Sequence, residues 1–399
     1  MPTSALFSGD GWDLEAPLFL SEPIETCSAK VPPDLPMLLE RLDAVAASGD
    51  ADLLAACFFT YESGVALEGS AELVRAVEGL PLAFFALFRI SRDQRISRVA
   101  ARASEPASKP SALVEIRAPD DLTPARWAAA VRAIREGIAR GDVYQVNLTR
   151  RMRFEGSPDP YALAAALFDS NPVPLALTLA TSDFAVVSNS PELFLDLDLP
   201  GRRAASGPIK GTVARGVSAR EDGAAVERLL ASAKDAAEHL MIVDLVRNDL
   251  GRVAVPGGVT VPKFRTLRSF RHLHHLESTV GARLPGDVRL SHVLSALLPA
   301  GSITGAPKRS ALSFIRELEP HPRGPYTGAA GYVRGNGRAV LNVAIRTAIL
   351  SRGRVDYHAG GGIVWDSDPE AEWRETETKS VEFAASVARL NAAREVRSE

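Results

Sequence analysis

The 399-residue sequence is short of cysteine, carries no large excess of either charge and contains no long apolar run. Its two cysteines, Cys27 and Cys57, lack metal-ligand spacing and are too few for a disulfide framework, so we expect a reducing cytoplasm. The formal net charge of -3 gives no basic field for nucleic acid. No segment approaches the roughly 18 uninterrupted apolar residues of a membrane span, and no basic stretch followed by an apolar core opens the chain. We therefore expect neither a membrane partner nor secretory targeting.

What is present is the composition of a globular protein with one large or two ordinary domains. Hydrophobic residues make up 46% of the chain and charged residues 24%, which are ordinary values. The apolar run 82–88 and the alternating run 143–149 predict strands, whereas 124–141 and 226–249 have helical periodicity. These elements, joined by hairpin-length turns such as 335–337, predict the fold class α+β with largely antiparallel sheets.

One stretch of the chain looks like a connection. Residues 101–121 are rich in Ala, Ser, Pro and charged residues and have no periodicity. We therefore expect an N-terminal region at 1–110 and a main domain at 120–395.

The segment Pro208-Ile209-Lys210-Gly211-Thr212 places a lysine in a glycine-flanked turn after an extended run. A buried amine loses solvation, which favours its neutral, nucleophilic form. Such a lysine can attack a substrate carbon directly. The alternative is an ordinary surface lysine on a loop, because lysines usually stay exposed.

Two predicted helices each carry a pair of carboxylates three residues apart. The pairs are Asp235 with Glu238 and Glu372 with Glu375, and this spacing puts both members of a pair on one helix face. If the two faces meet, they supply four oxygen ligands, which suits Mg²⁺. A solvated helix face is the alternative for each pair taken alone.

Two glycine-rich segments and one arginine have the character of a carboxylate-binding site. The loop 299–308 runs into a helix, where backbone N–H groups attract anions, and 360–362 is a run of three glycines. Arg346 lies in the apolar run 339–350, predicted to be a strand, so its guanidinium needs a carboxylate partner. The alternatives are a bulge at the end of a sheet and a structural ion pair.

A histidine and a glutamate are candidates for proton transfer. His275 belongs to a cluster with His272 and His274, but adjacent positions on a strand or turn point apart, so the three cannot ligate one ion. An acid, base or orienting role for His275 is more plausible than a zinc site, and a polar turn is the alternative. Glu192 begins an apolar strand, where burial can raise its pKa and make it a general acid, unless it is simply exposed.

Taken together, these segments resemble the chorismate-utilising enzymes and, within them, the aminodeoxychorismate synthases. The resemblance is dense from about Trp127 to Phe383. The matching motifs stand in one order: 141–149, 190–193, 208–212, 238–249, 299–308, 326–328, 360–364 and 366–372. The first hundred residues match more loosely, through 58–64, and resemble the N-terminal part of anthranilate synthase component I. The resemblance implies antiparallel sheets packed as a sandwich and flanked by helices.

The resemblance also implies roles for individual residues, with chorismate as substrate and Mg²⁺ as cofactor. It makes Glu238 and Glu375 direct metal ligands, with Glu372 and Asp235 acting through water. The catalytic residues that it implies are Lys210, Glu192 and His275. The residues that it places at the substrate are Gln145, Thr212, Ser302, Tyr326, Arg346, Gly360, Gly362 and Lys379.

Two positions separate the reactions within the family. The water-adding members resemble this chain but carry a lysine base where this chain has Gln145, which cannot act as a base at neutral pH. Anthranilate synthases usually have alanine where this chain has Lys210, and lysine there is typical of aminodeoxychorismate formation. The resemblance therefore implies conversion of chorismate and ammonia to 4-amino-4-deoxychorismate, for p-aminobenzoate and folate synthesis.

The expected source of ammonia is a separate glutaminase subunit. A glutamine-hydrolysing cysteine needs a sharp, glycine-flanked turn, and neither Cys27 nor Cys57 has that setting. Two alternatives stay open at this point: an anthranilate synthase component I and a chorismate-binding subunit without catalytic activity.

Overall fold

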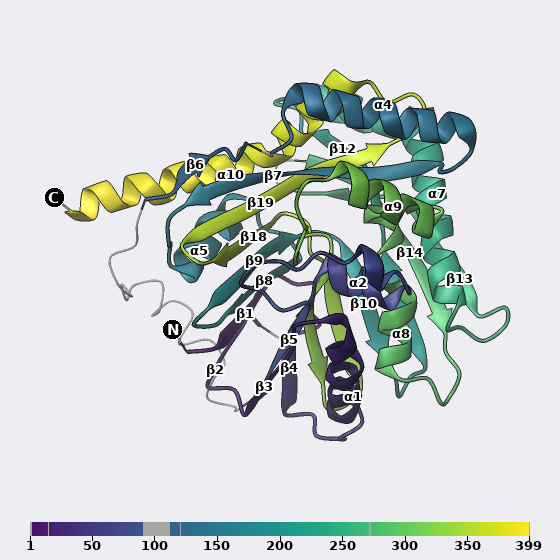
Figure 1. Ribbon diagram of the computed structural model, residues 1–399. Helices are drawn as coiled ribbons and strands as arrows, with labels where there is room; N and C mark the ends of the chain where they lie inside the picture. Colours follow the sequence, from purple (N-terminus) through teal and green to yellow (C-terminus); the bar gives the residue numbers. More distant parts are fainter. Residues whose placement is uncertain (1, 15, 91–111, 120, 271–272, 399) are drawn as a thin grey trace.

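The computed structural model describes residues 2–14, 16–90, 112–119, 121–270 and 273–398. These residues form two large antiparallel sheets with helices around them (Figure 1). The sheets face each other across a buried cluster to which one contributes Phe7 and Leu177 and the other Phe58 and Tyr332. This arrangement confirms the predicted α+β sandwich. Among the described helices, none combines the length and the apolar character needed to cross a membrane.

The first sheet has nine strands among the described residues, in the order β15-β7-β19-β18-β9-β8-β1-β2, with β6 beside β7. They are β1 (Ser4–Ser8), β2 (Leu18–Ser21), β6 (Val114–Ile116), β7 (Gln145–Glu155), β8 (Leu175–Ala180), β9 (Phe184–Ser190), β15 (Gly305–Ala306), β18 (Thr347–Ser351) and β19 (Arg354–Ile363). The strands β7 and β19 pair along their length, with Gly362 opposite Asn147. This pairing brings the three glycines of 360–362 against β7.

The second sheet has ten strands among the described residues, in the order β12-β14-β11-β10-β17-β16-β4-β5-β3, with β13 beside β14. They are β3 (Glu25–Ala29), β4 (Leu53–Phe59), β5 (Ala83–Arg89), β10 (Leu193–Asp198), β11 (Arg203–Gly207), β12 (Ile209–Ala214), β13 (Val259–Ser269), β14 (Leu273–Arg283), β16 (Ala329–Arg334) and β17 (Arg338–Val343). The first five strands of the chain extend both sheets, since β1 pairs with β8 and β4 with β16. The boundary expected near residue 110 stays a prediction, and residues 101–111 and 120 of the proposed connection lie outside the described residues.

Helices cover the outer faces of both sheets. They are α1 (Leu35–Ala46), α2 (Tyr61–Leu67), α4 (Pro124–Arg140), α5 (Pro160–Ser170), α6 (Ala219–Ala231), α7 (Ala233–Gly251), α8 (Leu290–Leu297), α9 (Lys308–Leu318) and α10 (Pro369–Ser398), with short 3-10 turns η1 (Pro32–Asp34), η2 (Ala71–Leu73) and η4 (Gly301–Ile303). The boundaries of α4 agree with the sequence: Thr123 accepts a hydrogen bond from Arg126 N, and Gly141 ends the helix at φ 82°. On the first sheet, Phe383 of α10 stacks on Tyr357 at a ring distance of 4.1 Å.

Two elements predicted as continuous are interrupted. The helix expected over 226–249 is two helices, because Ser232 leaves the helical conformation and its hydroxyl caps α7 by accepting from Asp235 N at 3.1 Å. The strand expected over 339–350 is β17 and β18, separated at Arg346, whose φ of 50° is left-handed. Both expectations were wrong because apolar periodicity does not register a local break in the backbone.

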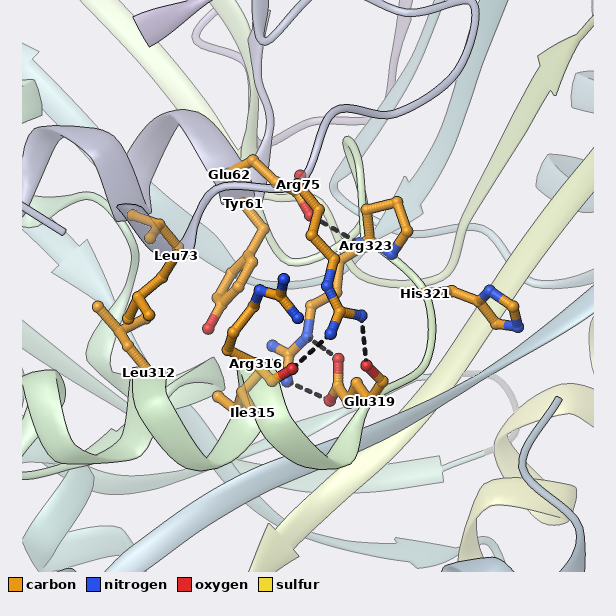
Figure 2. A pocket seen from close by; sticks show the side chains of 12 residues that line it. Tyr61, Glu62, Leu73, Arg75, Leu312, Ile315, Arg316, Glu319, His321 and Arg323 are labelled. Carbon is orange, nitrogen blue, oxygen red and sulfur yellow. Dashed lines mark hydrogen bonds and ion pairs between the residues drawn. The ribbon is translucent and has the colours of Figure 1, made fainter. Parts of the chain in front are cut away.

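A buried arginine joins several of these elements. Arg323 is 1% exposed and donates to Glu319 Oε1 at 2.6 Å, to Ile303 O at 2.9 Å and to Asn147 O at 2.6 Å. Its guanidinium also lies over the ring of Tyr61, so Arg323 contacts helix α2 as well (Figure 2). Through these contacts Arg323 fixes the loop before β15 to strand β7.

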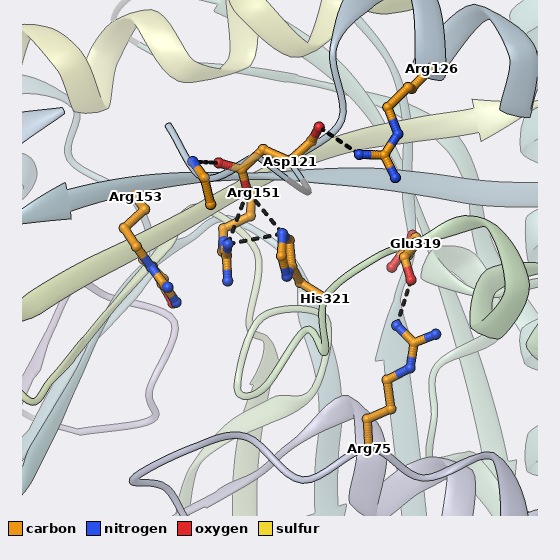
Figure 3. A network of polar contacts seen from close by, with 9 residues as sticks. Arg75, Asp121, Arg126, Arg151, Arg153, Glu319 and His321 are labelled. Atoms are coloured by element: carbon orange, nitrogen blue, oxygen red, sulfur yellow. Dashed lines mark hydrogen bonds and ion pairs between the residues drawn. The ribbon is translucent and has the colours of Figure 1, made fainter. Parts of the chain in front are cut away.

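A second polar network also contacts strand β7. The Asp121 carboxylate lies 2.9 Å from both Arg151 Nη2 and His321 Nε2 (Figure 3). Arg75 donates to the carbonyl oxygen of Glu319 at 2.6 Å and thereby holds the end of α9. Both networks therefore tie strand β7 to the segment that follows α9.

The Glu319→Gln substitution should destabilise the protein strongly. It leaves the Arg323 guanidinium buried without its charge partner, which costs about 3–5 kcal/mol in comparable cases. Denaturant unfolding of the wild type and the variant measures the difference. The matched control is Glu317→Gln, an exposed position on the same helix, which should change stability by less than about 0.5 kcal/mol. Equal effects of the two substitutions would show that the ion pair is not a structural anchor.

Candidate active site

Lys210 lies in strand β12 and not in the tight turn expected from its glycine neighbour. The pairing of β12 with β14 runs from Ile209 opposite Glu277 to Thr212 opposite His275, and the register shifts between these two pairs. Lys210 and Gly211 form the resulting bulge, and Gly211 has φ 85°. A glycine is needed for that conformation, which explains the Lys-Gly pair.

The amine of Lys210 contacts one of the predicted metal ligands. Lys210 Nζ lies 2.6 Å from Glu238 Oε2, and the lysine side chain is 26% exposed. Burial lowers the pKa of Lys210, but Glu238, Glu375 and Glu372 together outweigh burial, so the pKa lies above its ordinary value. The expectation of a neutral amine is therefore wrong for this conformation, because the neighbouring carboxylates stabilise the ammonium.

The two carboxylate pairs come together around this lysine from α7 and α10. Glu372 is buried and accepts a hydrogen bond from Ser367 Oγ at 2.7 Å, and Glu375 Oε1 lies 2.7 Å from Lys379 Nζ. A Cβ atom on Gly361 would lie 3.4 Å from Glu372 Oε2 and 3.6 Å from Glu375 Oε1. Both carboxylates therefore lie against the backbone of β19 at Gly361.

Asp235 completes the set of four. Its Cβ lies 3.5 Å from the place that a Cβ of Gly211 would occupy, so the start of α7 packs closely on the bulge of β12. Helix α7 contacts both β12 and β14 and lies next to β14 in Figure 1. Lys379, on α10, also donates from its Nζ to the Gly360 carbonyl oxygen at 2.8 Å.

These residues fit a hard divalent cation held partly through water. Across the described ranges, no three or more His, Cys, Asp or Glu side chains are arranged to hold a metal ion directly. Three carboxylates nevertheless act on one ammonium group, that of Lys210, and so already surround a positive charge. An all-oxygen donor set with few direct ligands suits Mg²⁺, which retains several waters.

Glu192 is a buried carboxyl beside the glycine-rich loop. It directly precedes β10, is 5% exposed and accepts a hydrogen bond from Ser302 Oγ at 3.2 Å. Burial raises the pKa of Glu192 to about 7, against the opposing effects of Ser302, the Ile209 backbone and Lys210. The carboxyl can therefore keep a proton near neutral pH, as a general acid must.

His275 is buried in β14, opposite Thr212 of β12. Burial, followed by the charges of Arg346 and Arg268, lowers the pKa of His275 to about 4, so its imidazole is neutral at pH 7. Its Nε2 makes no hydrogen bond among the described residues and lies 4.0 Å from Glu277 Oε2. An orphaned nitrogen in this position is open to a ligand.

The neighbouring histidines do not share this site. His274 Nε2 lies 2.9 Å from Asp222 Oδ1, and its Nδ1 lies 2.8 Å from Ser269 Oγ, so its ring has structural partners. His272 lies outside the described residues.

The other predicted substrate residues lie on the strands and helices around this cluster. Gln145 is buried against β19, where a Cβ on Gly362 would lie 2.7 Å from its Nε2, and its Oε1 is unpaired among the described residues. Tyr326 is buried and stacks on His358 at 5.2 Å. Arg346, predicted in a strand, sits at the break before β18 and lies 3.6 Å from Glu382 Oε2 of α10. Thr212 is exposed at the edge of the sheet.

His239, which contacts the backbone of Lys210, and Ser278, which contacts His239, were not predicted from the sequence. His239 Nδ1 lies 3.1 Å from Lys210 O, and His239 Nε2 lies 2.6 Å from Ser278 Oγ. His239 directly follows Glu238, and that adjacency was the available signal. Ser278 has no comparable motif, because its contact depends on how β14 packs on α7.

Comparison with known proteins matches most of the chain to one family of enzymes. A family model described as chorismate binding enzyme matches residues 33–385. The chain is 42% identical over 257 residues to anthranilate synthase component 1 of Haloferax volcanii, covering 63% of this chain and 49% of that protein. It is 41% identical over 256 residues to aminodeoxychorismate synthase component 1 of Escherichia coli, covering 64% and 56%. The chain thus spans about half the length of the curated relatives it matches.

Solved structures superpose on a larger part of this chain than the sequence matches cover. Anthranilate synthase component I from Streptococcus pneumoniae superposes with a TM-score of 0.76 at 26% identity, covering 96% of this chain and 92% of that one. A menaquinone-specific isochorismate synthase of Escherichia coli superposes with a TM-score of 0.73 at 19% identity, covering 96% and 88%. The second likeness shows the fold alone.

The buried Glu192 carboxyl should make stability depend on pH. Its folded pKa of about 7 lies above the ordinary value of 4.5, so folding favours the protonated form, and stability falls as pH rises from about 4.5 to 7. Glu192→Gln removes this penalty. Relative to the wild type, the variant should gain up to about 3 kcal/mol between pH 5 and pH 8.

Denaturant unfolding at both pH values measures this gain. Lys210 and Glu277 are the charged groups that act on Glu192 from β12 and β14, so each series must be run at one ionic strength. A stability difference between variant and wild type that is the same at pH 5 and pH 8 would contradict the raised pKa.

Proposed function

This chain belongs to the family of chorismate-binding enzymes, and on that premise we propose that it is the first component of an aminodeoxychorismate synthase. The proposed reaction converts chorismate and ammonia to 4-amino-4-deoxychorismate. The observation that carries the proposal is Lys210, which stands where the resembling anthranilate synthases usually have alanine. Its amine lies 2.6 Å from Glu238 on α7, and the charges of Glu372 and Glu375 on α10 also act on it.

Gln145 supports amination over hydration. The water-adding enzymes that this chain resembles carry a lysine base at this position, and an amide has no basic lone pair at neutral pH. Gln145 is buried against Gly362, and we propose that its uncharged side chain lines the site.

The proposed chemistry has two displacements, which split one hard substitution into two easier ones. Lys210 first leaves Glu238 and transfers a proton to water, and its neutral Nζ then bonds to ring C2. The C4 hydroxyl departs as water after taking the proton of Glu192, as the two ring double bonds shift. Ammonia then bonds to C4 and displaces the lysine as a neutral amine, and the ammonium so formed returns a proton to Glu192.

The remaining residues hold the diacid in place. Arg346, Ser302, Tyr326, Thr212, Lys379 and the amides of Gly360 and Gly362 are the proposed contacts. His275, whose Nε2 has no hydrogen-bond partner among the described residues, is a further proposed contact. When bound, Mg²⁺ would fix and polarise a substrate carboxylate. Glu238 and Glu375 are its proposed direct ligands, with Glu372 and Asp235 acting through water.

The proposed partner is a separate glutaminase subunit that supplies the ammonia. Burial raises the pKa of the Cys57 thiol to about 12, and burial with Glu25 raises that of Cys27, so neither described thiol has the character of a nucleophile. The names of the relatives designate them as first components, which supports a second one here.

A second candidate function is anthranilate synthesis, favoured by the 42% identity to an anthranilate synthase component 1. Incubation with chorismate, Mg²⁺ and ammonium, followed by mass analysis of the product, separates the candidates. We expect an aminated product that keeps its enolpyruvyl group. Anthranilate with released pyruvate would assign the second function, and absence of turnover would favour a binding subunit without catalytic activity.

Lys210→Ala should lower kcat for amination by roughly 10³-fold, or about 4 kcal/mol of transition-state stabilisation. Its matched control is Lys30→Ala, at an exposed position outside the site, which should leave kcat unchanged. Steady-state rates with saturating ammonium measure both. Full aminating activity in Lys210→Ala would remove the covalent step from the mechanism.

A further inference from the structure

His239 is a buried imidazole that the proposed chemistry does not use. It is 1% exposed, on the face of α7 that packs on β12 and β14. Its Nδ1 lies 3.1 Å from the Lys210 carbonyl oxygen, and its Nε2 lies 2.6 Å from Ser278 Oγ. The ring of Phe264 meets the imidazole edge-on at 5.7 Å and limits its rotation.

The chemistry of these partners determines which nitrogen carries the hydrogen. A carbonyl oxygen can only accept, so Nδ1 is the donor to Lys210 O. In the neutral ring Nε2 is then the acceptor, and the Ser278 hydroxyl donates to it. Arg265 N in turn donates to Ser278 Oγ at 3.0 Å. The result is a directed chain from Arg265 through Ser278 and His239 to the backbone of Lys210.

The first member of this chain is held in an unusual conformation. Arg265 has φ 49°, in the left-handed region, at a register shift of β13 against β14. A non-glycine residue in this region is costly and persists only where its surroundings impose it. The Arg265 guanidinium also donates to Leu230 O at 3.1 Å, which ties this backbone to α6.

The backbone of Lys210 lacks regular pairing with the neighbouring strand, so a hydrogen bond from His239 can stabilise it. The register between β12 and β14 passes from Ile209 to Thr212 and skips Lys210, so this residue lies where the ladder is disrupted. The imidazole supplies a bond to its carbonyl group from outside the ladder. Because the side chain projects from that backbone, a small rotation of the bulge would move Nζ by a larger distance.

We propose that His239, oriented by Ser278, is the positioning residue that aims the Lys210 side chain. Glu238 holds the ammonium of Lys210, while the next residue on α7 holds its carbonyl group. The catalytic consequence rests on the proposed function, whereas the orientation of the lysine does not. Misplacement of a reacting group by about 1 Å can cost roughly 100-fold in rate, and loss of this hydrogen bond should have an effect of that order.

Three substitutions at one position separate positioning from simple packing. In His239→Asn the amide nitrogen occupies nearly the position of Nδ1 and can donate to Lys210 O. In His239→Gln the amide extends to the position of Nε2 and reaches Ser278 instead. His239→Leu fills the space and bonds to neither.

Two readouts are measured on the full chain. The first is kcat and KM for chorismate with saturating ammonium. The second is the rate at which acetic anhydride labels Lys210, scored by peptide mass spectrometry against the exposed Lys30 as an internal reference. The second readout needs no turnover, so it tests positioning even if the wild type forms no aminated product, a result that would count only against the proposed function.

We expect His239→Leu and His239→Gln to lose roughly 100-fold in kcat with little change in KM, and His239→Asn to recover most of it. The labelling rate of Lys210 should change several-fold in the Leu and Gln variants and stay near the wild-type value in Asn. Equal kcat and equal labelling in all four proteins would overturn the proposal.

Ser278→Ala provides a second route if His239→Leu does not fold. It leaves the imidazole in place and removes the hydroxyl that orients it, so both readouts should shift in the same direction as in the Leu variant, by a smaller factor. Wild-type values of kcat and of Lys210 labelling in Ser278→Ala would contradict the role given to the directed chain.

Discussion

Two consecutive residues of one helix hold the two ends of Lys210, and the rest of the site is arranged around that contact. Glu238 meets its ammonium at 2.6 Å, and His239 meets its carbonyl oxygen at 3.1 Å. Neighbouring residues on a helix point about 100° apart, so both can reach one residue only where the strand crosses close to the helix. The bulge with Gly211 at φ 85° provides that close crossing.

The two sheets contribute different parts of the site. The second sheet supplies Lys210 on β12 and His275 on β14, while the first supplies Gln145 on β7 and the glycines of β19. Arg323 is the link between the loop and the first sheet, since it bonds to both Ile303 O and Asn147 O. That loop carries Ser302, which donates a hydrogen bond to Glu192. The buried ion pair of Arg323 with Glu319 therefore also helps to hold Ser302 in place.

Local patterns in the sequence predicted the fold class and the carboxylate pairs that lie near Lys210, but not the details of the backbone. Periodicity and turn residues were sufficient for an antiparallel α+β protein, and the pairs on α7 and α10 were sufficient to expect a carboxylate cluster. The breaks at Ser232 and Arg346 were not predicted, because one side-chain cap and one left-handed residue leave the apolar pattern of the sequence intact. The contact of His239 with Ser278 joins positions 39 residues apart and depends on packing that no local pattern encodes.

The proposed mechanism depends on a covalent bond between the Lys210 amine and the substrate ring. The most direct measurement is mass spectrometry of the wild type after incubation with chorismate and Mg²⁺ without ammonium, quenched in acid and digested. We expect a peptide containing Lys210 whose mass is raised by that of chorismate less one water, and which loses the label when ammonium is added before the quench. An unmodified Lys210 in a preparation that aminates chorismate when ammonium is supplied would contradict the account.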